Sequence, residues 1–499
     1  MKKIIYITLF IPSMLFSQVK KDTLVKKEIP KVTYKKRVLE TAEIDILSSF
    51  YTQTGSNAAV TGGIGTEQLD DYAGNITISI PLNDDAILSI DATVSAYSSA
   101  SSSNLNPFYN LNNRDDDDDD RSSGGKYPIG TVISAASTPS AAGTIIGTPW
   151  VASSGASKED TWVSGVVGYS HSSDSRNSIY KAHVSFANEF DYTSFGAGVG
   201  FTKLFHQKNT EIGIDANVYL DRWNPMYPTE IKTFKTYNGN LNTSFFSGVD
   251  IYNQQGVVID KNLLSAWKPV NTDLVDNEAR NSYSLSISFS QILSKNSQIS
   301  IFADYLMQKG WLANPMQRVY FSDKPNFYIG DKSFINTYAN SSNLGVFQLA
   351  DDIERLPNTR IKTPIGIRYH HYLNEKITLR TYFRYYFDDW GVNSQTIQIE
   401  LPIKIGEKYA MYPSFRYYNQ TQADYFAPYE KHVSTSNYYT SDYDLSKYNS
   451  NQYGIGLKYT DIFASFFGVK NVNLNYYFYK RNTGLTAHII SLGAKFIIE

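Results

Sequence analysis

Charged side chains recur within segments of strictly alternating polar and apolar residues, and they are the residues of this sequence best placed to bind or steer a solute. In such a segment every second side chain lies on the same face of a β-strand. The segment 86–97 is an example, because its apolar residues share one face and its only acidic residue, Asp91, lies on the other. A charge on a polar face is stable where water or a partner meets it. We therefore treat the polar faces as the candidate functional surface.

By the parity of their positions, the charges on these polar faces separate by sign along the chain. The acidic set precedes residue 311 and comprises Asp91, Glu189, Asp215 and Asp304. The basic set follows residue 359 and comprises Arg368, Arg380, Arg384, Arg416 and Lys458. In a closed barrel the two sets would face each other and orient polar solutes in a transverse field. The alternative is that they pair and fill the interior; Lys181 and His183 on the acidic side weaken the segregation.

An acidic run between two alternating segments is a second candidate for chemistry. It comprises Asp115, Asp116, Asp117, Asp118, Asp119 and Asp120. Clustered carboxylates suit hard cations such as calcium, but consecutive aspartates lack the ligand spacing of a calcium loop and its closing Glu. We favour a solvated acidic loop tip, with calcium binding as the alternative. The sequence indicates no other cofactor.

Histidine and serine residues offer little further chemistry. His370 and His371 are neighbours on an expected strand, so they point to opposite faces and cannot chelate one metal ion together. His183, Ser185 and Glu189 share one face, but we interpret them as lining residues rather than as a Ser/His/acid set. The chain has no Gly-x-Ser-x-Gly elbow and no His-Glu-x-x-His helix. We therefore predict that the protein is not an enzyme, and we keep an outer-membrane hydrolase as a minor alternative.

The alternating segments are long enough to cross a membrane as tilted strands, which takes roughly 9 to 11 residues each. We expect about sixteen strands in a transmembrane antiparallel up-and-down β-barrel, an all-β fold. They lie near 44–54, 73–80, 86–97, 161–171, 178–189, 193–204, 210–222, 281–292, 298–310, 360–372, 376–388, 393–403, 408–418, 451–460, 471–480 and 486–498. The 39 tyrosines crowd near strand ends, as aromatic girdles at the headgroups require.

The connections between these strands predict an orientation. An up-and-down outer-membrane barrel alternates short periplasmic turns with longer extracellular loops. The long connections at 98–160, 223–280, 311–359 and 419–450 all fall on one side, whereas the other side has short turns only. We therefore expect the protein to lie in the outer membrane of the cell, with both termini in the periplasm.

The N-terminal residues predict export. Residues 1–17 resemble a secretory signal peptide, with two lysines before an apolar stretch and a cut after Ser17. Residues 18–43 form a basic periplasmic tail that is too short for a folded plug, and residues 44–499 form the barrel. The absence of cysteine excludes disulfides and thiolate metal sites. A net charge of −2 argues against a nucleic-acid partner.

Several short motifs make the sequence similar to a known family. They lie at 59–67, 80–84, 154–160, 484–485 and 491–493. On these motifs the chain resembles an uncharacterised domain-of-unknown-function family of outer-membrane β-barrel proteins of Bacteroidetes-type bacteria. The resemblance covers about residues 44–499 by the strand count. It implies a barrel and an outer-membrane location, and it implies no activity or substrate.

These features together predict a porin-like channel or solute-binding barrel for small polar solutes, embedded in outer-membrane lipid, with the long loops narrowing its mouth. The alternative is a surface interaction protein with a blocked lumen, whose outer loops bind a partner, a glycan or calcium. A homo-oligomer, such as a trimer, is expected only by analogy with porins of this size.

Overall fold

The computed structural model describes residues 37–98, 159–270, 273–338, 346–461, 463–464 and 468–498. All of these residues belong to one compact unit, Arg37–Glu499. The expected signal peptide, most of the tail and the aspartate run at 115–120 lie outside the described residues. Within the described ranges, no helix has both the length and the apolar character needed to cross a membrane.

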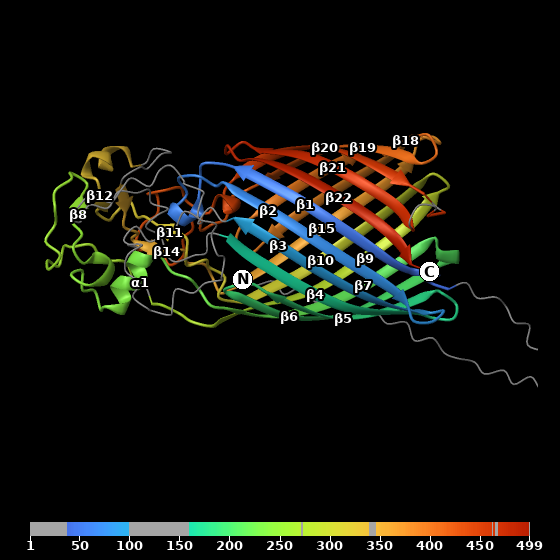
Figure 1. Cartoon of the computed structure of the whole chain (residues 1–499), viewed down its shortest axis with the longest axis horizontal. Helices are drawn as coiled ribbons and strands as arrows, with labels where there is room; N and C mark the ends of the chain where they lie inside the picture. The colour runs from blue at the N-terminus through green and yellow to red at the C-terminus, as the bar shows by residue number, and fades with distance from the viewer. Residues whose placement is uncertain are drawn as a thin grey trace, which may run out of the picture. The chain divides into compact units, whose positions relative to one another are not determined.

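One antiparallel sheet closes on itself to form a barrel (Figure 1). Its strands are β1 (Ala42–Thr54), β2 (Leu69–Pro81), β3 (Ala86–Ser98), β4 (Glu159–Ser172), β5 (Ser178–Asn188), β6 (Tyr192–Phe205), β7 (Thr210–Trp223), β9 (Glu278–Ser294), β10 (Ser297–Gly310), β15 (Thr359–Tyr372), β16 (Thr378–Asp388), β17 (Asn393–Glu400), β18 (Ile403–Ile405), β19 (Tyr409–Gln420), β20 (Tyr448–Thr460), β21 (Val469–Arg481) and β22 (Thr486–Ile498). Each strand pairs with its neighbours along the chain, and β1 also pairs with β22, with Ala42 opposite Ile498. This last pairing closes the ring.

Proline interrupts the strand that the sequence predicts at 393–403. In its place the structure has β17 and β18, which both pair with β19 and are separated by Leu401 and Pro402. Proline has no N–H to donate to a sheet ladder, which explains the break. Counted as one strand, β17 and β18 reduce the 17 strands of the sheet to a 16-stranded barrel. The predicted fold class and strand number are confirmed.

The outer face of the barrel is an exposed apolar surface. Tyr180, Phe201, Ile214 and Ile287 occupy one row across four neighbouring strands, and all four side chains are exposed. Similar rows run around the ring, for example Ile301 beside Ile367. An apolar surface of this extent is a liability in water and fits the acyl chains of a membrane.

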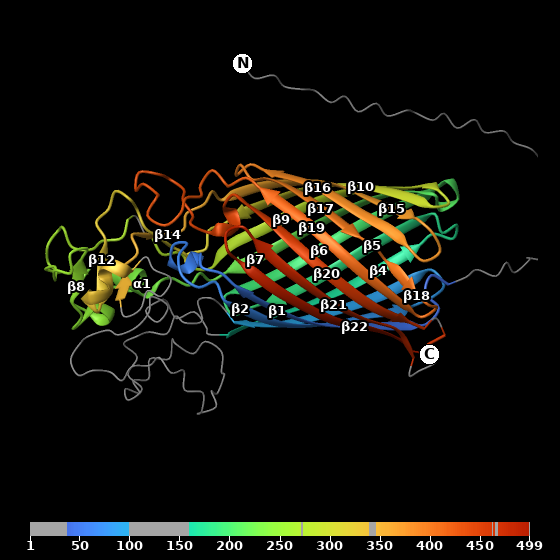
Figure 2. The ribbon, with the colours of Figure 1, turned by 90° about the horizontal axis from the view of Figure 1, so that it is seen from above.

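Long loops gather at one end of the barrel, which we call the loop end, and short turns gather at the other, the turn end (Figures 1 and 2). Connections 224–277, 311–358 and 421–447 lie at the loop end, as does 55–68. The turn end has short connections such as 82–85 and 295–296. β1 begins and β22 ends at the turn end, so both ends of the barrel chain lie there.

The described parts of the loops 55–68, 224–277, 311–358 and 421–447 pack together, and we call them the cap. It contains η1 (Ala59–Thr61), α1 (Thr229–Thr236), η5 (Ser244–Phe246), β8 (Ile251–Asn253), β11 (Arg318–Val319), β12 (Phe327–Gly330), η6 (Lys332–Thr337), β13 (Val346–Gln348), β14 (Asp352–Ile353) and η7 (Tyr443–Leu445), whereas η4 (His206–Lys208) lies in a turn at the other end. Its buried core includes Ile231, Phe246, Trp267, Ile329 and Phe347. The cap therefore has a hydrophobic core of its own, outside the barrel.

A buried ion pair joins three of the cap loops. The Nε of Arg318 donates to Glu230 Oε1 at 2.7 Å, and its Nη2 donates to Oε2 at 3.1 Å. Both side chains are buried, and Arg318 Nη1 also donates to the Val60 carbonyl at 2.9 Å. Such a bidentate pair is costly to break, because removing one partner leaves a buried charge without its counter-ion.

We expect Arg318→Gln to destabilise the cap by about 3–5 kcal/mol, because the Glu230 carboxylate would stay buried without a cationic partner. Urea titration with pulses of protease measures cap unfolding, while heat-modifiable gel migration reports whether the barrel is still closed. The matched control is Lys235→Gln, which removes an exposed pair with Asp273 and should cost at most about 1 kcal/mol. Equal losses in the two variants would contradict the assignment.

Candidate functional site

Three of the acidic residues singled out from the sequence lie on the sheet face opposite the exposed apolar rows, and this face lines the lumen. Asp215 on β7 and Asp304 on β10 both pair in register with Ser286 of β9, so the two carboxylates flank one serine. Asp91 lies further around the ring on β3. Asn75 Nδ2 donates to its carboxylate at 3.1 Å, and Thr77 Oγ1 donates at 2.6 Å. Neutral donors from the next strand thus hold this charge.

Glu189, the fourth predicted acidic residue, lies one residue beyond the end of the strand on which the sequence predicts it. β5 ends at Asn188, and Glu189 opens the tight turn to β6. Burial raises the pKa of Glu189, and the nearby charge of Asp191 raises it further. Glu189 lines a cavity of about 690 Å³ together with Tyr219 and Gln308, which share the lumen faces of β7 and β10 with Asp215 and Asp304.

We call the lumen face of β3, β7 and β10, with Asp91, Asp215 and Asp304, the acidic wall, and that of β15, β16, β19 and β20 the basic wall; β10 and β15 are neighbours in the ring. Two residues of the basic wall already have partners. Arg380 Nη1 forms an ion pair with Glu400 Oε1 at 2.8 Å, across the β16–β17 ladder. The guanidinium of Arg368 lies 5.1 Å from the ring centre of Phe302 and 5.6 Å from that of Tyr382. These aromatic contacts hold the Arg368 charge against the wall.

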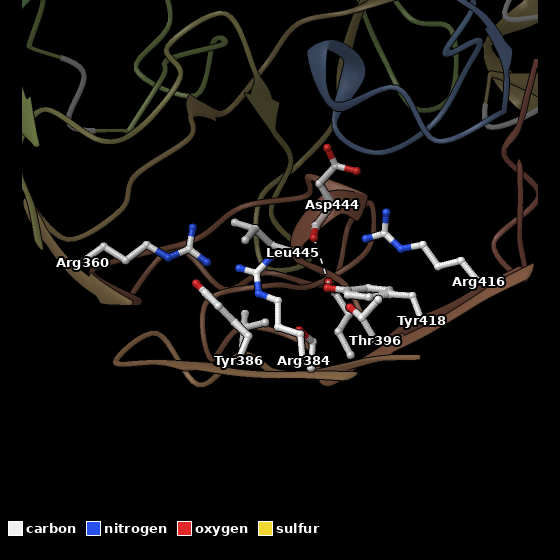
Figure 3. A pocket seen from close by; sticks show the side chains of 11 residues that line it. Arg360, Arg384, Tyr386, Thr396, Arg416, Tyr418, Asp444 and Leu445 are labelled. Atoms are coloured by element: carbon white, nitrogen blue, oxygen red, sulfur yellow. Dashed lines mark hydrogen bonds between the residues drawn. The ribbon is translucent and has the colours of Figure 1, made fainter. Parts of the chain in front are cut away.

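Lys458 and the remaining two arginines complete this wall. Lys458 lies on β20, opposite Ala410 and Asn473 in the ladders. Arg384 on β16 and Arg416 on β19 line a second cavity, of about 190 Å³ (Figure 3). Its lining residues are Arg360, Arg384, Tyr386, Val392, Ser394, Thr396, Arg416, Tyr418, Gln420, Asp444 and Leu445. We call it the arginine pocket.

Asp388 anchors one side of the arginine pocket. Its Oδ2 accepts from Arg360 Nη2 at 2.6 Å and from the Tyr386 hydroxyl at 2.7 Å. Its Oδ1 accepts from the backbone N–H groups of Trp390 and Val392, at 3.0 and 2.9 Å. The Arg360 guanidinium also stacks on the Trp390 ring, 4.3 Å from its centre. The charge of Arg360 is thereby balanced and its side chain is fixed.

Sequence reasoning missed Arg360 and Asp388, although the signal was present. Arg360 has the same parity as Arg368 on one strand, so alternation alone places it in the lumen. Glu400 was missed too, and its pairing with Arg380 depends on the register of the β16–β17 hairpin, which alternation does not specify.

The acidic and basic walls do not neutralise each other. In the described part of the chain, no ion pair joins Asp91, Asp215 or Asp304 to the arginines of β15, β16 or β19. The basic wall forms its ion pairs with acids of its own strands, as with Glu400 and Asp388. Opposite charges therefore persist on the two walls.

Several bulky lumen side chains lie along the wall over glycines of the next strand. A Cβ on Gly198 would meet the His183 ring at 2.3 Å, and one on Gly366 would meet the Phe302 ring at 2.1 Å. Glycine is therefore needed there for close approach. His183 and Ser185 lie on β5, and Glu189 follows one residue after its end.

Histidines form no metal centre in the described ranges. His370 lies in the lumen opposite Arg380, whereas His371 lies on the outer face, where its ring stacks on Tyr369. No three His, Asp or Glu side chains in those ranges are placed to hold a metal ion. The calcium prediction for residues 115–120 falls outside them.

A closed antiparallel barrel with an apolar exterior and a charged lumen is the architecture of outer-membrane β-barrel proteins. The chain belongs to the family described as "Protein of unknown function (DUF3570)", whose sequence pattern matches residues 25–489. The resemblance drawn from the short motifs is thus confirmed at the level of an uncharacterised family that spans the chain. No curated protein has significant sequence similarity to this one.

Among solved structures, the chain is similar to outer-membrane proteins. A bacterial polysaccharide outer membrane secretin has 8% identity and a TM-score of 0.40, with 92% of this chain and 99% of that chain covered. The TodX deltaS2S3 mutant monoaromatic hydrocarbon channel has 9% identity and a TM-score of 0.38, covering 92% and 91%. OccK1 (OpdK) of Pseudomonas aeruginosa has 7% identity and a TM-score of 0.34, covering 92% and 98%. Likeness at these scores says nothing about solute or mechanism.

Two buried carboxyl groups of the cap, those of Glu354 and Asp351, have raised pKa values. Burial raises the pKa of Glu354 to about 8, and the charge of Asp442 adds to the rise. The Glu354 Oε2 accepts from the Asn314 N–H at 2.6 Å. Burial likewise raises the pKa of Asp351 to about 7. Both groups favour the neutral form within the folded cap.

We expect the cap to lose stability as the pH rises. The folded pKa of Glu354, about 8, exceeds its ordinary value of 4.5, so the folded cap binds this proton more tightly than the unfolded chain does. The contribution is complete below pH 4.5 and is lost as the pH rises through 8. Hydrogen exchange measures this loss: protection factors of the β12 amides, corrected for intrinsic exchange, should fall between pH 4.5 and 8. The fall should be smaller in the Glu354→Gln variant. Protection that increases with pH would contradict this assignment.

Proposed function

We propose that the protein is an outer-membrane channel that passes small polar solutes between an acidic and a basic wall. The observation that carries the proposal is that Asp91, Asp215 and Asp304 form no ion pair with the lumen arginines among the described residues, so charges of both signs remain on one closed lumen surface. In strand order, Asp91 on β3 and Arg384 on β16 lie half the ring apart. A solute with separated positive and negative groups would align between them.

The size of the barrel supports a conducting lumen. Barrels of 16 to 18 strands generally leave an aqueous channel. Bulky residues that lie against wall glycines, such as Phe302 over Gly366, keep their volume at the wall. In this proposal the loop end faces the exterior. The short turns and both termini, with the basic tail at 18–43, then face the periplasm.

Surface binding by the cap is the second candidate function. It is favoured by the hydrophobic core of the cap, which includes Trp267 and Phe347 at about 1% exposure, and by the buried pair of Arg318 and Glu230. An ordered platform of this kind can present a defined surface to a partner or a glycan. The channel carries the main proposal because cap order by itself does not require a charged lumen.

Planar-bilayer recording tests the channel. The purified full-length barrel should give stepwise ion currents whose size scales with salt concentration, because barrels of 16 strands generally enclose an aqueous channel. Protein unfolded by boiling before reconstitution is the control. A closed, heat-modifiable barrel that inserts and carries no current would overturn the channel and leave surface binding as the function.

The acidic wall should influence ion selectivity. In the double variant Asp215→Asn and Asp304→Asn, we expect the reversal potential in a salt gradient to move toward anion preference, since two lumen carboxylates are lost. The matched control is Asp273→Asn, which removes a charge from a cap side chain that is 98% exposed. An equal shift in the control would contradict a role for the wall.

A further inference from the structure

We propose that the arginine pocket is a binding site for the carboxylate of a small organic anion, held by Arg384 and Arg416. This inference rests on the proposed passage of polar solutes and names a class of solute that the lumen would select.

Arg384 and Arg416 are the two cations of this pocket that form no ion pair with a described residue, although the Arg384 guanidinium lies 5.8 Å from the ring centre of Tyr386. The Nε of Arg384 is buried and has no hydrogen-bond partner in the described chain. The side chain of Arg416 forms no ion pair or hydrogen bond with any described residue. A buried guanidinium N–H without an acceptor has lost its hydrogen bonds to water, which costs free energy. A bound oxyanion would accept from this N–H and offset that cost.

The charged partners and the Tyr418 and Gln420 side chains of the pocket are already engaged. Asp388 takes up the charge of Arg360, as described above. Asp444, at the roof, accepts from Arg481 Nη1 at 2.6 Å, so its charge is balanced as well. The Tyr418 hydroxyl donates to Gln420 Oε1 at 2.6 Å, and Gln420 Nε2 donates to the Ser446 carbonyl at 2.6 Å. The pocket therefore presents two positive charges with fixed surroundings.

The position of the two arginines suits a shared anion. In the ladder, Arg384 is opposite Thr396 of β17, which is in turn opposite Tyr418, two residues along β19 from Arg416. Figure 3 shows both guanidinium groups directed into the space under Asp444 and Leu445. Guanidinium groups bind carboxylates and phosphates through paired N–H donors.

The volume and the lining favour a small carboxylate. About 190 Å³ is below the roughly 300–1,000 Å³ of sites for drug-sized ligands. Val392 and Leu445 add apolar surface beside the cations, which suits the carbon chain of an organic acid. Inorganic phosphate has the same oxyanion chemistry and no carbon chain, so it serves as the competing probe.

Calorimetric titration of the full-length protein in a non-ionic detergent and a carboxylate-free buffer tests the site. Succinate should bind saturably and more tightly than inorganic phosphate, and neutral succinamide should not bind. Arg384→Gln and Arg416→Gln should each weaken succinate about tenfold or more, because each removes a charged hydrogen-bond donor. Affinity should also fall as sodium chloride rises.

Arg368→Gln is the matched control, because it removes an equal charge from the same wall outside the pocket; succinate affinity should stay within about twofold of wild type. Heat-modifiable migration verifies closure of every variant. Absent succinate binding, tighter phosphate binding, or an equal loss in Arg368→Gln would overturn the proposal. The calorimetric measurement does not depend on ion conductance, so the two proposals can fail separately. Succinate binding to a barrel that carries no current would support the binding site and overturn the channel. Conductance without succinate binding would support the channel and overturn the binding site.

Discussion

The need to pair every backbone polar group inside a bilayer is the constraint on which this structure depends. A sheet edge exposed to lipid would leave N–H and C=O groups without water or partners, each at a cost of several kcal/mol. The β1–β22 ladder removes the edge. Once the ring is closed, alternation assigns every side chain to lipid or lumen, so an apolar exterior and a charged interior follow from the same closure.

Alternation and loop length were enough to predict most of the barrel. The segments at 86–97 and 210–222 became β3 and β7 with ends shifted by one residue, because a two-residue period marks a half-buried strand clearly. Prediction was poorer where local chemistry ends a strand, as at Pro402. The cap could not be predicted, since its core joins loops far apart in sequence, such as Ile231 and Phe347.

The sequence was enough to predict which face of its strand each arginine of the site occupies, but not which residue it contacts. Parity identified Arg384 and Arg416 as inward residues, and the structure places both in one pocket. Parity also grouped them with Arg380 and Arg368, which are bound to Glu400 and to aromatic rings. Which arginine lacks an ion pair depends on the cross-strand register and on the loop 421–447, whose Asp444 and Leu445 line the pocket. Neither can be predicted from the sequence of one strand.

The Asp388 carboxylate both holds the β16–β17 turn and balances the charge of Arg360. The same carboxylate accepts from the N–H groups of the β16–β17 turn and from the guanidinium of Arg360, so turn geometry and local lumen charge have one anchor. Changes at Arg384 or Arg416 would alter what the lumen attracts while leaving the turn intact. Changes at Asp388 would alter both. Within one wall, descendants of this sequence could therefore diversify solute preference at some arginines, whereas Arg360 and Asp388 would have to change together.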